Sequence, residues 1–471
     1  MNPLGLTFLV GNLVVAPLII MLDRSTRGVC LAIATGWILL SPRAGINLPG
    51  IPAFTKDFSV SYGVLIGLLL FRGDLIRRFR PRPIDLFCLL CMIGPFFSSL
   101  ANGLGVWDAC SELYGRIIVW GTPYLVGRVL VKDLDDVRDC ALAILLAALI
   151  IVPLCLVEIR LSPQLHRWVY GTHAAPFHMA KRLGGYRPTL MFRHGIEVGT
   201  WLATGGIIGI WFSMTGTRRH LFGVSLKSQT AVLVVVNLIS RSLGSIALLT
   251  GSCLVAVVTR TTRTRLALLA LAIATPTYLA LRITNVWSPV VVIELVDQFI
   301  DSERAESFSA RVFQEEELGN KARRKIFFGW GGHNRFRVFD DAGEQTTAVD
   351  PLWLITFGKY GLFGIVGLYG MLCLPAILVT LRTPARYLLH PKMAGVVALM
   401  LAMAIATGDS LQNAFFSPLM MVAAGVLSTT AVSLRSWLPR SAAPRFRQDA
   451  TTAHHPARTP VQSGQIPQQE E

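Results

Sequence analysis

The sequence predicts an all-α integral membrane protein with about 12–13 transmembrane helices and one large extracytoplasmic loop. Its composition supports this, because 52% of the 471 residues are hydrophobic and only 15% are charged. That is more apolar surface than the core of one soluble domain needs. Apolar runs of roughly 15 to 20 residues also recur from Leu6 to Leu434, each bounded by Arg, Lys, Pro or Gly.

These apolar runs give the predicted spans in chain order. They cover residues 6–22, 28–41, 57–71, 84–101, 112–131, 139–158, 195–214, 228–239, 243–259, 266–282, 351–381, 393–408 and 414–434. The first run lacks a basic leader and a small-residue cleavage site, so we expect a retained span. The predicted organisation is a bundle at 1–282 with an outer arginine-rich loop at 159–194, an extracytoplasmic loop at 283–350, C-terminal helices at 351–434 and a disordered cytoplasmic tail at 435–471.

The positions of the basic residues predict the orientation of the bundle. Arg and Lys in short loops stay on the cytoplasmic side of a membrane. Basic clusters stand at 72–82, 218–219, 260–265 and 382–392, in loops that the predicted spans place on the same face of the membrane. We expect that face to be cytoplasmic. The segments 158–194, 240–242 and 283–350 then lie outside, together with the N-terminus.

The first of these outer loops is basic, although basic residues in short loops normally stay on the cytoplasmic side. After Glu158 it has no acidic residue, and it carries Arg160, Arg167, Lys181, Arg182, Arg187 and Arg193 before it ends at His194. Guanidinium groups pair bidentately with phosphate, so a phosphate or pyrophosphate group is the first candidate partner. Contact with anionic lipid headgroups at the outer surface is the alternative.

The second outer loop combines a charged helix with a glycine-rich turn. Residues 303–325 read as a helix, and we expect its acidic run at 315–317 to be a solvated surface. The turn at 329–332 lacks the Gly-Lys-Ser/Thr ending of a phosphate-binding P-loop. It leads into His333, Asn334, Arg335 and Arg337. His333 is a candidate general base, with a merely solvated loop histidine as the alternative.

Several features inside the spans also carry predictions. Ionisable residues at membrane depth usually face a cavity or each other, and here they are Arg116, Glu197, Arg241, Lys359 and Asp409. Glycines at three- and four-residue spacing predict close helix packing at 195–209 and 361–370. Cys88 and Cys91 form a C-x-x-C, but their apolar neighbours favour packed side chains over a metal site.

Taken together, this layout resembles the O-antigen ligase and O-antigen polymerase superfamily of bacterial membrane glycosyltransferases, over roughly residues 81–434. One large outer loop stands before the last three spans, as in that superfamily. The motifs that carry the resemblance are Arg182-Leu183-Gly184-Gly185, Ser240-Arg241, Ser309-Ala310-Arg311, Phe328-Gly329-Trp330-Gly331 and Tyr360-Gly361-Leu362-Phe363-Gly364.

The resemblance implies an activity, partners and binding residues. A glycan would be transferred from a polyprenyl pyrophosphate-linked saccharide to an acceptor hydroxyl, at the outer face of the bacterial inner membrane. The implied partners are that lipid, the bilayer and other polysaccharide assembly proteins, with no nucleic acid, metal or cofactor. Arg182, Arg241 and Arg311 match the family's arginines. The neighbouring binding candidates are Arg187, Arg193, His194, Arg335 and Arg337.

The sequence departs from the family at the residue that would orient the acceptor. The family commonly places a His-Asn pair about eleven residues before the glycine pattern that enters the next span, and here Asp350 stands at that point. His333-Asn334 lies earlier, so the catalytic candidates are Arg311 with Asp350 or His333, and position favours Asp350. A polymerase is favoured over a ligase. The rivals are a flippase for lipid-linked saccharides and an inactive assembly subunit.

Overall fold

The computed structural model describes residues 3–47, 49–182, 184–287, 302–345, 347 and 349–437. Its main helices are α1 (Pro3–Leu22), α2 (Thr26–Leu39), α3 (Lys56–Phe71), α5 (Asp85–Ala101), α6 (Val106–Arg116), α7 (Thr122–Leu130), α8 (Leu134–Leu161), α10 (Gly195–Thr215), α11 (Leu226–Ile239), α12 (Leu243–Thr262), α13 (Leu266–Ile283), α15 (Ser302–Arg323), α16 (Leu352–Arg382), α18 (Ala394–Asp409) and α19 (Pro418–Trp437).

Short elements complete the described fold. They are α4 (Gly73–Ile76), α9 (Leu165–Tyr170), α17 (Ala385–Leu388), the π-helix η1 (Ile117–Gly121) and the 3-10 helices η2 (Phe177–Ala180) and η3 (Pro391–Met393). Three antiparallel two-stranded pairs join β1 (Gly45–Ile46) to β2 (Phe54–Thr55), β3 (Lys181–Arg182) to β4 (Gly185–Tyr186) and β5 (His220–Leu221) to β6 (Val224–Ser225).

The protein is an all-α, multi-pass integral membrane protein, as predicted. Among the described residues, eight helices are long and apolar enough to cross a membrane, and three shorter apolar helices accompany them. Every predicted span falls on helical structure. The apolar window of α10 is 89% buried and that of α12 only 28%, so α10 lies at the centre of the bundle and α12 at its rim.

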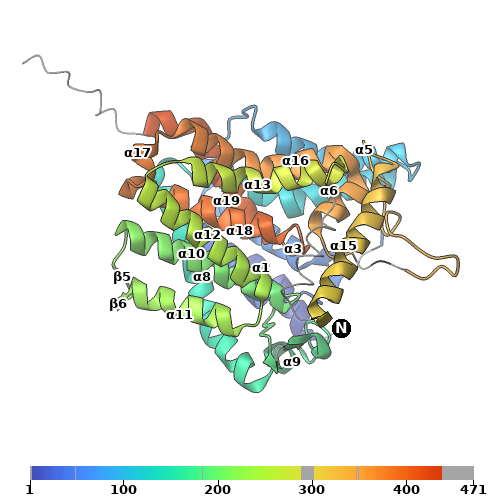
Figure 1. Ribbon diagram of the computed structural model, residues 1–471, viewed down its shortest axis with the longest axis horizontal. Helices are drawn as coiled ribbons and strands as arrows, with labels where there is room; N and C mark the ends of the chain where they lie inside the picture. Colours follow the sequence, from blue (N-terminus) through green and yellow to red (C-terminus); the bar gives the residue numbers. More distant parts are fainter. Residues whose placement is uncertain are drawn as a thin grey trace, which may run out of the picture.

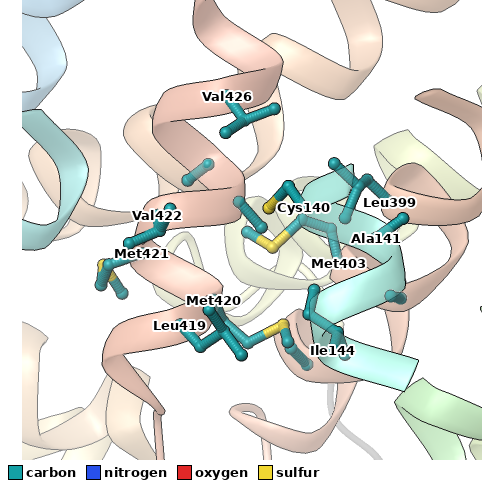
Figure 2. Close-up of a cluster of buried hydrophobic side chains, with 14 of the residues drawn as sticks. Cys140, Ala141, Ile144, Leu399, Met403, Leu419, Met420, Met421, Val422 and Val426 are labelled. Atoms are coloured by element: carbon teal, nitrogen blue, oxygen red, sulfur yellow. The ribbon is translucent and has the colours of Figure 1, made fainter. Parts of the chain in front are cut away.

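The core of the bundle is built where α8, α18 and α19 meet. Figure 2 shows buried side chains there, which come from Cys140, Ala141 and Ile144 on α8, Leu399 and Met403 on α18, and Leu419, Met420, Met421, Val422 and Val426 on α19. Glycines allow the helices around it to approach closely. A Cβ at Gly205 would overlap Ala148 of α8, and one at Gly367 would overlap the backbone of α5, which confirms the predicted role of these glycines in packing.

The two ends of the bundle carry different connections (Figure 1). At the end that we call the α9 end, α9 lies near the start of α1, where Phe8 meets Tyr170 edge-on at 6.0 Å. The opposite end, the α17 end, holds α17 and β5–β6. There, basic side chains cap helix C-termini: Arg265 donates to the Leu381 carbonyl at 2.7 Å.

Several helix boundaries differ from the prediction. The span predicted at 112–131 begins earlier and runs through α6, η1 and α7, because five residues adopt a π-helix between two α-helical pieces. α16 is broken at Gly361, where φ is 62° and ψ is −153°. α19 continues to Trp437, past the predicted start of the tail at 435, and the rest of the tail lies outside the described residues.

Candidate functional site

The arginine-rich loop at 159–194 is held at both ends by one carboxylate. Glu158 is buried, and its carboxylate accepts backbone N–H groups from Leu165 at 3.0 Å, Thr189 at 2.7 Å and Leu190 at 2.8 Å. A carboxylate that accepts several N–H groups satisfies donors which would otherwise be buried unpaired. The acidic residue that opens this loop therefore fixes its backbone.

A buried histidine ties the same loop to the end of α2. His166 meets the Thr172 carbonyl through Nδ1 at 2.5 Å and the Ser41 hydroxyl through Nε2 at 2.9 Å. These partners suit a neutral imidazole that donates from Nδ1 and accepts at Nε2. Burial lowers the pKa of His166 below its ordinary value of 6.5, which keeps the ring neutral.

Three predicted arginines come together at the α9 end, in a group that we call the arginine junction (Arg182, Arg187 and Arg241). Arg241 Nη1 donates to the Arg182 carbonyl at 2.7 Å, and Arg187 Nη2 donates to the Arg241 carbonyl at 2.9 Å. Gly185 leaves the necessary space, because a Cβ there would overlap the Arg241 guanidinium. Arg241 itself has a φ of 60° in the turn between α11 and α12.

Arg193 and His194 have partners of a different kind at the start of α10. Arg193 Nη2 forms an ion pair with Asp57 Oδ2 at 2.5 Å. His194 caps α10 by accepting the Ile196 N–H at 3.2 Å, and its ring stacks on Phe415 with centroids 5.8 Å apart. Both residues therefore stabilise the start of α10.

Sequence reasoning predicted Glu197 as a charge at membrane depth but missed Lys56, which lies beside this helix start. Lys56 Nζ donates to the Met191 carbonyl at 3.1 Å and lies 4.7 Å from the centre of the Trp37 ring. The Trp37 indole donates to the buried Glu197 carboxylate at 2.8 Å. Lys56 directly precedes the apolar run at 57–71, and a charged residue at that place is the ordinary sign that a span begins, so it gave no hint of these contacts.

The glycine turn of the large loop docks into the break in α16, and we call this contact the loop–helix junction (326–331 with 358–363). Trp330 and Gly331 donate their N–H groups to the carbonyls of residues 358 and 359 at 2.8 and 3.0 Å. In return, Leu362 and Phe363 donate to the carbonyls of residues 326 and 327 at 2.8 and 3.3 Å. The loop thus supplies the backbone partners that the broken helix lacks.

The catalytic candidates lie on either side of this junction. His333 is exposed and follows the turn directly, and Asp350 is exposed just before α16. Leu352, two residues after Asp350, donates its N–H to the Ser410 carbonyl at 3.1 Å, so Asp350 lies next to the 410–417 segment. Among the residues that the structure describes, no hydrogen bond or ion pair joins either candidate to an arginine.

The remaining arginine candidates belong to the large loop. Arg335 Nη1 donates to the Asn102 carbonyl at 3.4 Å, and Arg337 bonds to the side chain of Gln345. Arg311 lies within α15, and its side chain is outside the described residues, as are residues 288–301.

The prediction of a solvated acidic run on α15 is wrong at Glu315. Its carboxylate is buried against Arg282 of α13, with Oε1 at 2.6 Å from Nε and side-chain exposures of 8% and 2%. Tyr278 donates to the same oxygen at 2.8 Å, and Glu316 pairs with Arg282 Nη2 at 3.1 Å. The acidic face of α15 therefore packs against the bundle, where Glu315 and Glu316 pair with Arg282.

A second polar group lies inside the bundle beside the break in α16, and we call it the kink cluster (Glu112, Arg116, Lys359 and Tyr360). Glu112 Oε1 lies 3.4 Å from Lys359 Nζ, and Tyr360 donates to Glu112 Oε2 at 2.8 Å. The Arg116 guanidinium lies 4.7 Å from the centre of the Tyr360 ring. Two of the predicted intramembrane charges, Arg116 and Lys359, thus meet at the Tyr360 ring, and the carboxylate of Glu112 beside them was not predicted.

No protein-family model, curated protein or solved structure matches the chain. Within the described part of the chain, no three or more His, Cys, Asp or Glu side chains are grouped to hold a metal ion. The chemistry that this arrangement offers is cationic and hydrogen-bonding. It suits the binding of an anionic group.

Proposed function

We propose that the chain is a membrane glycosyltransferase of the bacterial inner membrane, which acts on polyprenyl pyrophosphate-linked saccharides in the synthesis of an exopolysaccharide or O-antigen. The arginine junction supports this proposal most directly. It unites residues that are 54 and 59 positions apart in the sequence. It joins the β3–β4 segment of the arginine-rich loop to the turn between α11 and α12.

The junction offers the chemistry that a pyrophosphate leaving group needs. In the proposed reaction, the acceptor oxygen bonds to the anomeric carbon of the donor sugar while the bond from that carbon to the pyrophosphate oxygen breaks. The bonding electrons leave with the polyprenyl pyrophosphate, and the hydroxyl proton passes to a base. Guanidinium groups held in place by backbone carbonyls stabilise the charge that develops, without reorganising during the step.

Asp350 is the preferred base, and His333 is the alternative. Both are exposed, as a group that meets a sugar hydroxyl must be. Asp350 adjoins the 410–417 segment, whose Phe415 stacks on His194 next to Arg193. Position thus favours Asp350 in the fold as it does in the sequence.

The proposal is tested by purified protein in lipid nanodiscs with polyprenyl pyrophosphate-linked repeat units as the substrate. We expect Arg241→Gln to lower chain extension about 100-fold or more, since it removes a donor to the developing charge. Loss of activity in Asp350→Asn or in His333→Gln identifies the base. Lys227→Gln, at an exposed position of α11 at the α17 end, is the matched control.

The acceptor separates the two enzyme classes. Growth of the lipid-linked chain identifies a polymerase, which we favour, whereas transfer only to an added lipid A core identifies a ligase. Protein that is folded and binds the lipid, but transfers to neither acceptor, contradicts the proposal and favours transport or assembly.

A further inference from the structure

The kink cluster carries more positive than negative charge inside the bundle. Glu112 contributes one carboxylate, and Arg116 and Lys359 contribute two cations. Among the described residues, no carboxylate forms a direct ion pair with the Arg116 guanidinium; Glu112, one turn earlier on α6, attracts it from a greater distance and is shared with Lys359. Arg116 and Lys359 both fall within predicted spans, where an uncompensated cation is costly.

The immediate surroundings of Arg116 are aromatic. Its guanidinium lies 4.7 Å from the centre of the Tyr360 ring and 5.2 Å from that of Trp120. Contacts with two ring faces offset part of the cost of desolvating a guanidinium, but they do not neutralise it. The cluster is therefore incomplete in charge, and an anion would complete it.

The kink cluster lies partly at the protein surface and is built on fixed elements. The side chain of Glu112 is 30% exposed and that of Lys359 is 14% exposed, so one side of the cluster is open. The Lys359 carbonyl accepts both the Ser98 hydroxyl at 2.7 Å and the Gly331 N–H at 3.0 Å. The loop–helix junction thereby fixes the backbone that carries Lys359.

The position of the cluster indicates a ligand that is held at the membrane. Trp120 stacks on Phe416 with ring centroids 6.0 Å apart, and Phe415 stacks on His194. This aromatic contact path connects the cluster with the start of α10, through residues that offer flat apolar faces. Such surroundings suit a charged headgroup with an apolar chain better than a fully hydrated ion.

We propose that Arg116 and Lys359 form a second anion site, separate from the arginine junction, which binds the phosphate or pyrophosphate group of a membrane lipid. Glu112 moderates the affinity of this site, because it holds Lys359 and places a negative charge beside the ligand. The site does not depend on glycosyl transfer. Its ligand chemistry has two sources, an ordinary anionic phospholipid and a polyprenyl pyrophosphate.

The test counts bound lipids by native mass spectrometry, on protein in neutral detergent titrated with farnesyl pyrophosphate. We expect the double variant Arg116→Gln, Lys359→Met to bind one molecule fewer than the wild type. Lys227→Gln should bind as many as the wild type. Arg241→Gln reports on the arginine junction independently, so failure of the proposed function is distinguished from failure of this site.

Glu112→Gln distinguishes an anion site from a structural ion pair. Removing the carboxylate raises the local charge by one, so we expect the affinity for farnesyl pyrophosphate to rise, by about tenfold. A structural ion pair predicts the opposite, lower affinity and lower thermal stability. Unchanged stoichiometry in the double variant, or weaker binding by a folded Glu112→Gln protein, overturns the proposal.

Competition experiments with other ligands identify which class of lipid occupies the site. Displacement of farnesyl pyrophosphate by phosphatidylglycerol at equal concentration assigns a general headgroup site, and preference for farnesyl pyrophosphate assigns a polyprenyl lipid. Either result supports the lipid phosphate site. Displacement by inorganic pyrophosphate at the same concentration as farnesyl pyrophosphate overturns it, because the lipid chain would then contribute nothing.

Discussion

The ion pair between Arg282 and Glu315 gives a strong prediction about how the large loop is held. Arg282→Met removes a guanidinium whose side chain is 2% exposed, and it leaves Glu315, 8% exposed, with Tyr278 as its hydrogen-bond donor. Breaking a buried pair in this way costs about 3–5 kcal/mol, chiefly because the remaining charge stays buried. We therefore expect α15 to separate from α13 far more often.

Hydrogen–deuterium exchange measures this separation directly. At about 1.4 kcal/mol for each tenfold change, the amides of α15 should exchange about 100- to 4,000-fold faster in Arg282→Met. Glu317→Gln on the same helix, which removes a charge that has no ion pair within the described residues, should change exchange less than threefold or so. The double variant Arg282→Met, Glu315→Leu should recover most of the protection, because two apolar groups then replace the pair.

Equal exchange rates in Arg282→Met and Glu317→Gln would refute the reasoning. So would a double variant that is less protected than Arg282→Met alone, since that would mean the contact depends on Glu315 in some way other than its charge.

Three further predictions concern the loop–helix junction and the arginine-rich loop. Gly361→Ala places a Cβ against the Phe327 carbonyl, at a residue whose φ is 62°, so it should undock the glycine turn. We expect faster proteolysis within 333–345 as the result. Gly244→Ala is the control, because its Cβ meets no atom within 4 Å and should leave proteolysis unchanged. Glu158→Gln leaves at least one of three buried N–H groups poorly paired, at a cost of about 1–3 kcal/mol, so the amides of residues 189 and 190 should exchange about 10- to 100-fold faster. Because burial lowers the pKa of His166 below 6.5, its stabilising contribution is complete above about pH 6.5 and is lost as the pH falls towards the lowered value. The thermal stability of His166→Gln should therefore depend less on pH between about 7.5 and 5 than that of the wild type; an identical pH dependence would contradict this.

The fold was largely predictable because membrane spans are a local property. Each crossing needs its own apolar run, and that run is visible in the sequence without knowledge of its neighbours. Two of the boundary errors arose where a helix departs from regular geometry. Nothing in the run at 106–130 distinguishes a π-helix from an α-helix, and the break at Gly361 depends on backbone contacts with residues 326 and 327.

The candidate sites were predictable only in part, because charge pairing is not local. Arg241 stood out as a cation in a short turn, and the structure does bring it to Arg182 and Arg187. Glu112 and Lys359 are 247 positions apart, so nothing in the sequence joins them. Glu112 and Arg116 are four residues apart on α6, and that opposite-charge spacing is the signal by which the cluster could have been found.

The exchange of backbone hydrogen bonds between the glycine turn and α16 also constrains how the protein is assembled. A helix broken within a bilayer leaves polar backbone groups without water to satisfy them, so α16 reaches its final form only when residues 326–331 have docked. Completion of this helix and docking of the glycine turn are therefore coupled. For the same reason, we expect any movement of the large loop to pivot on segments outside the docked turn.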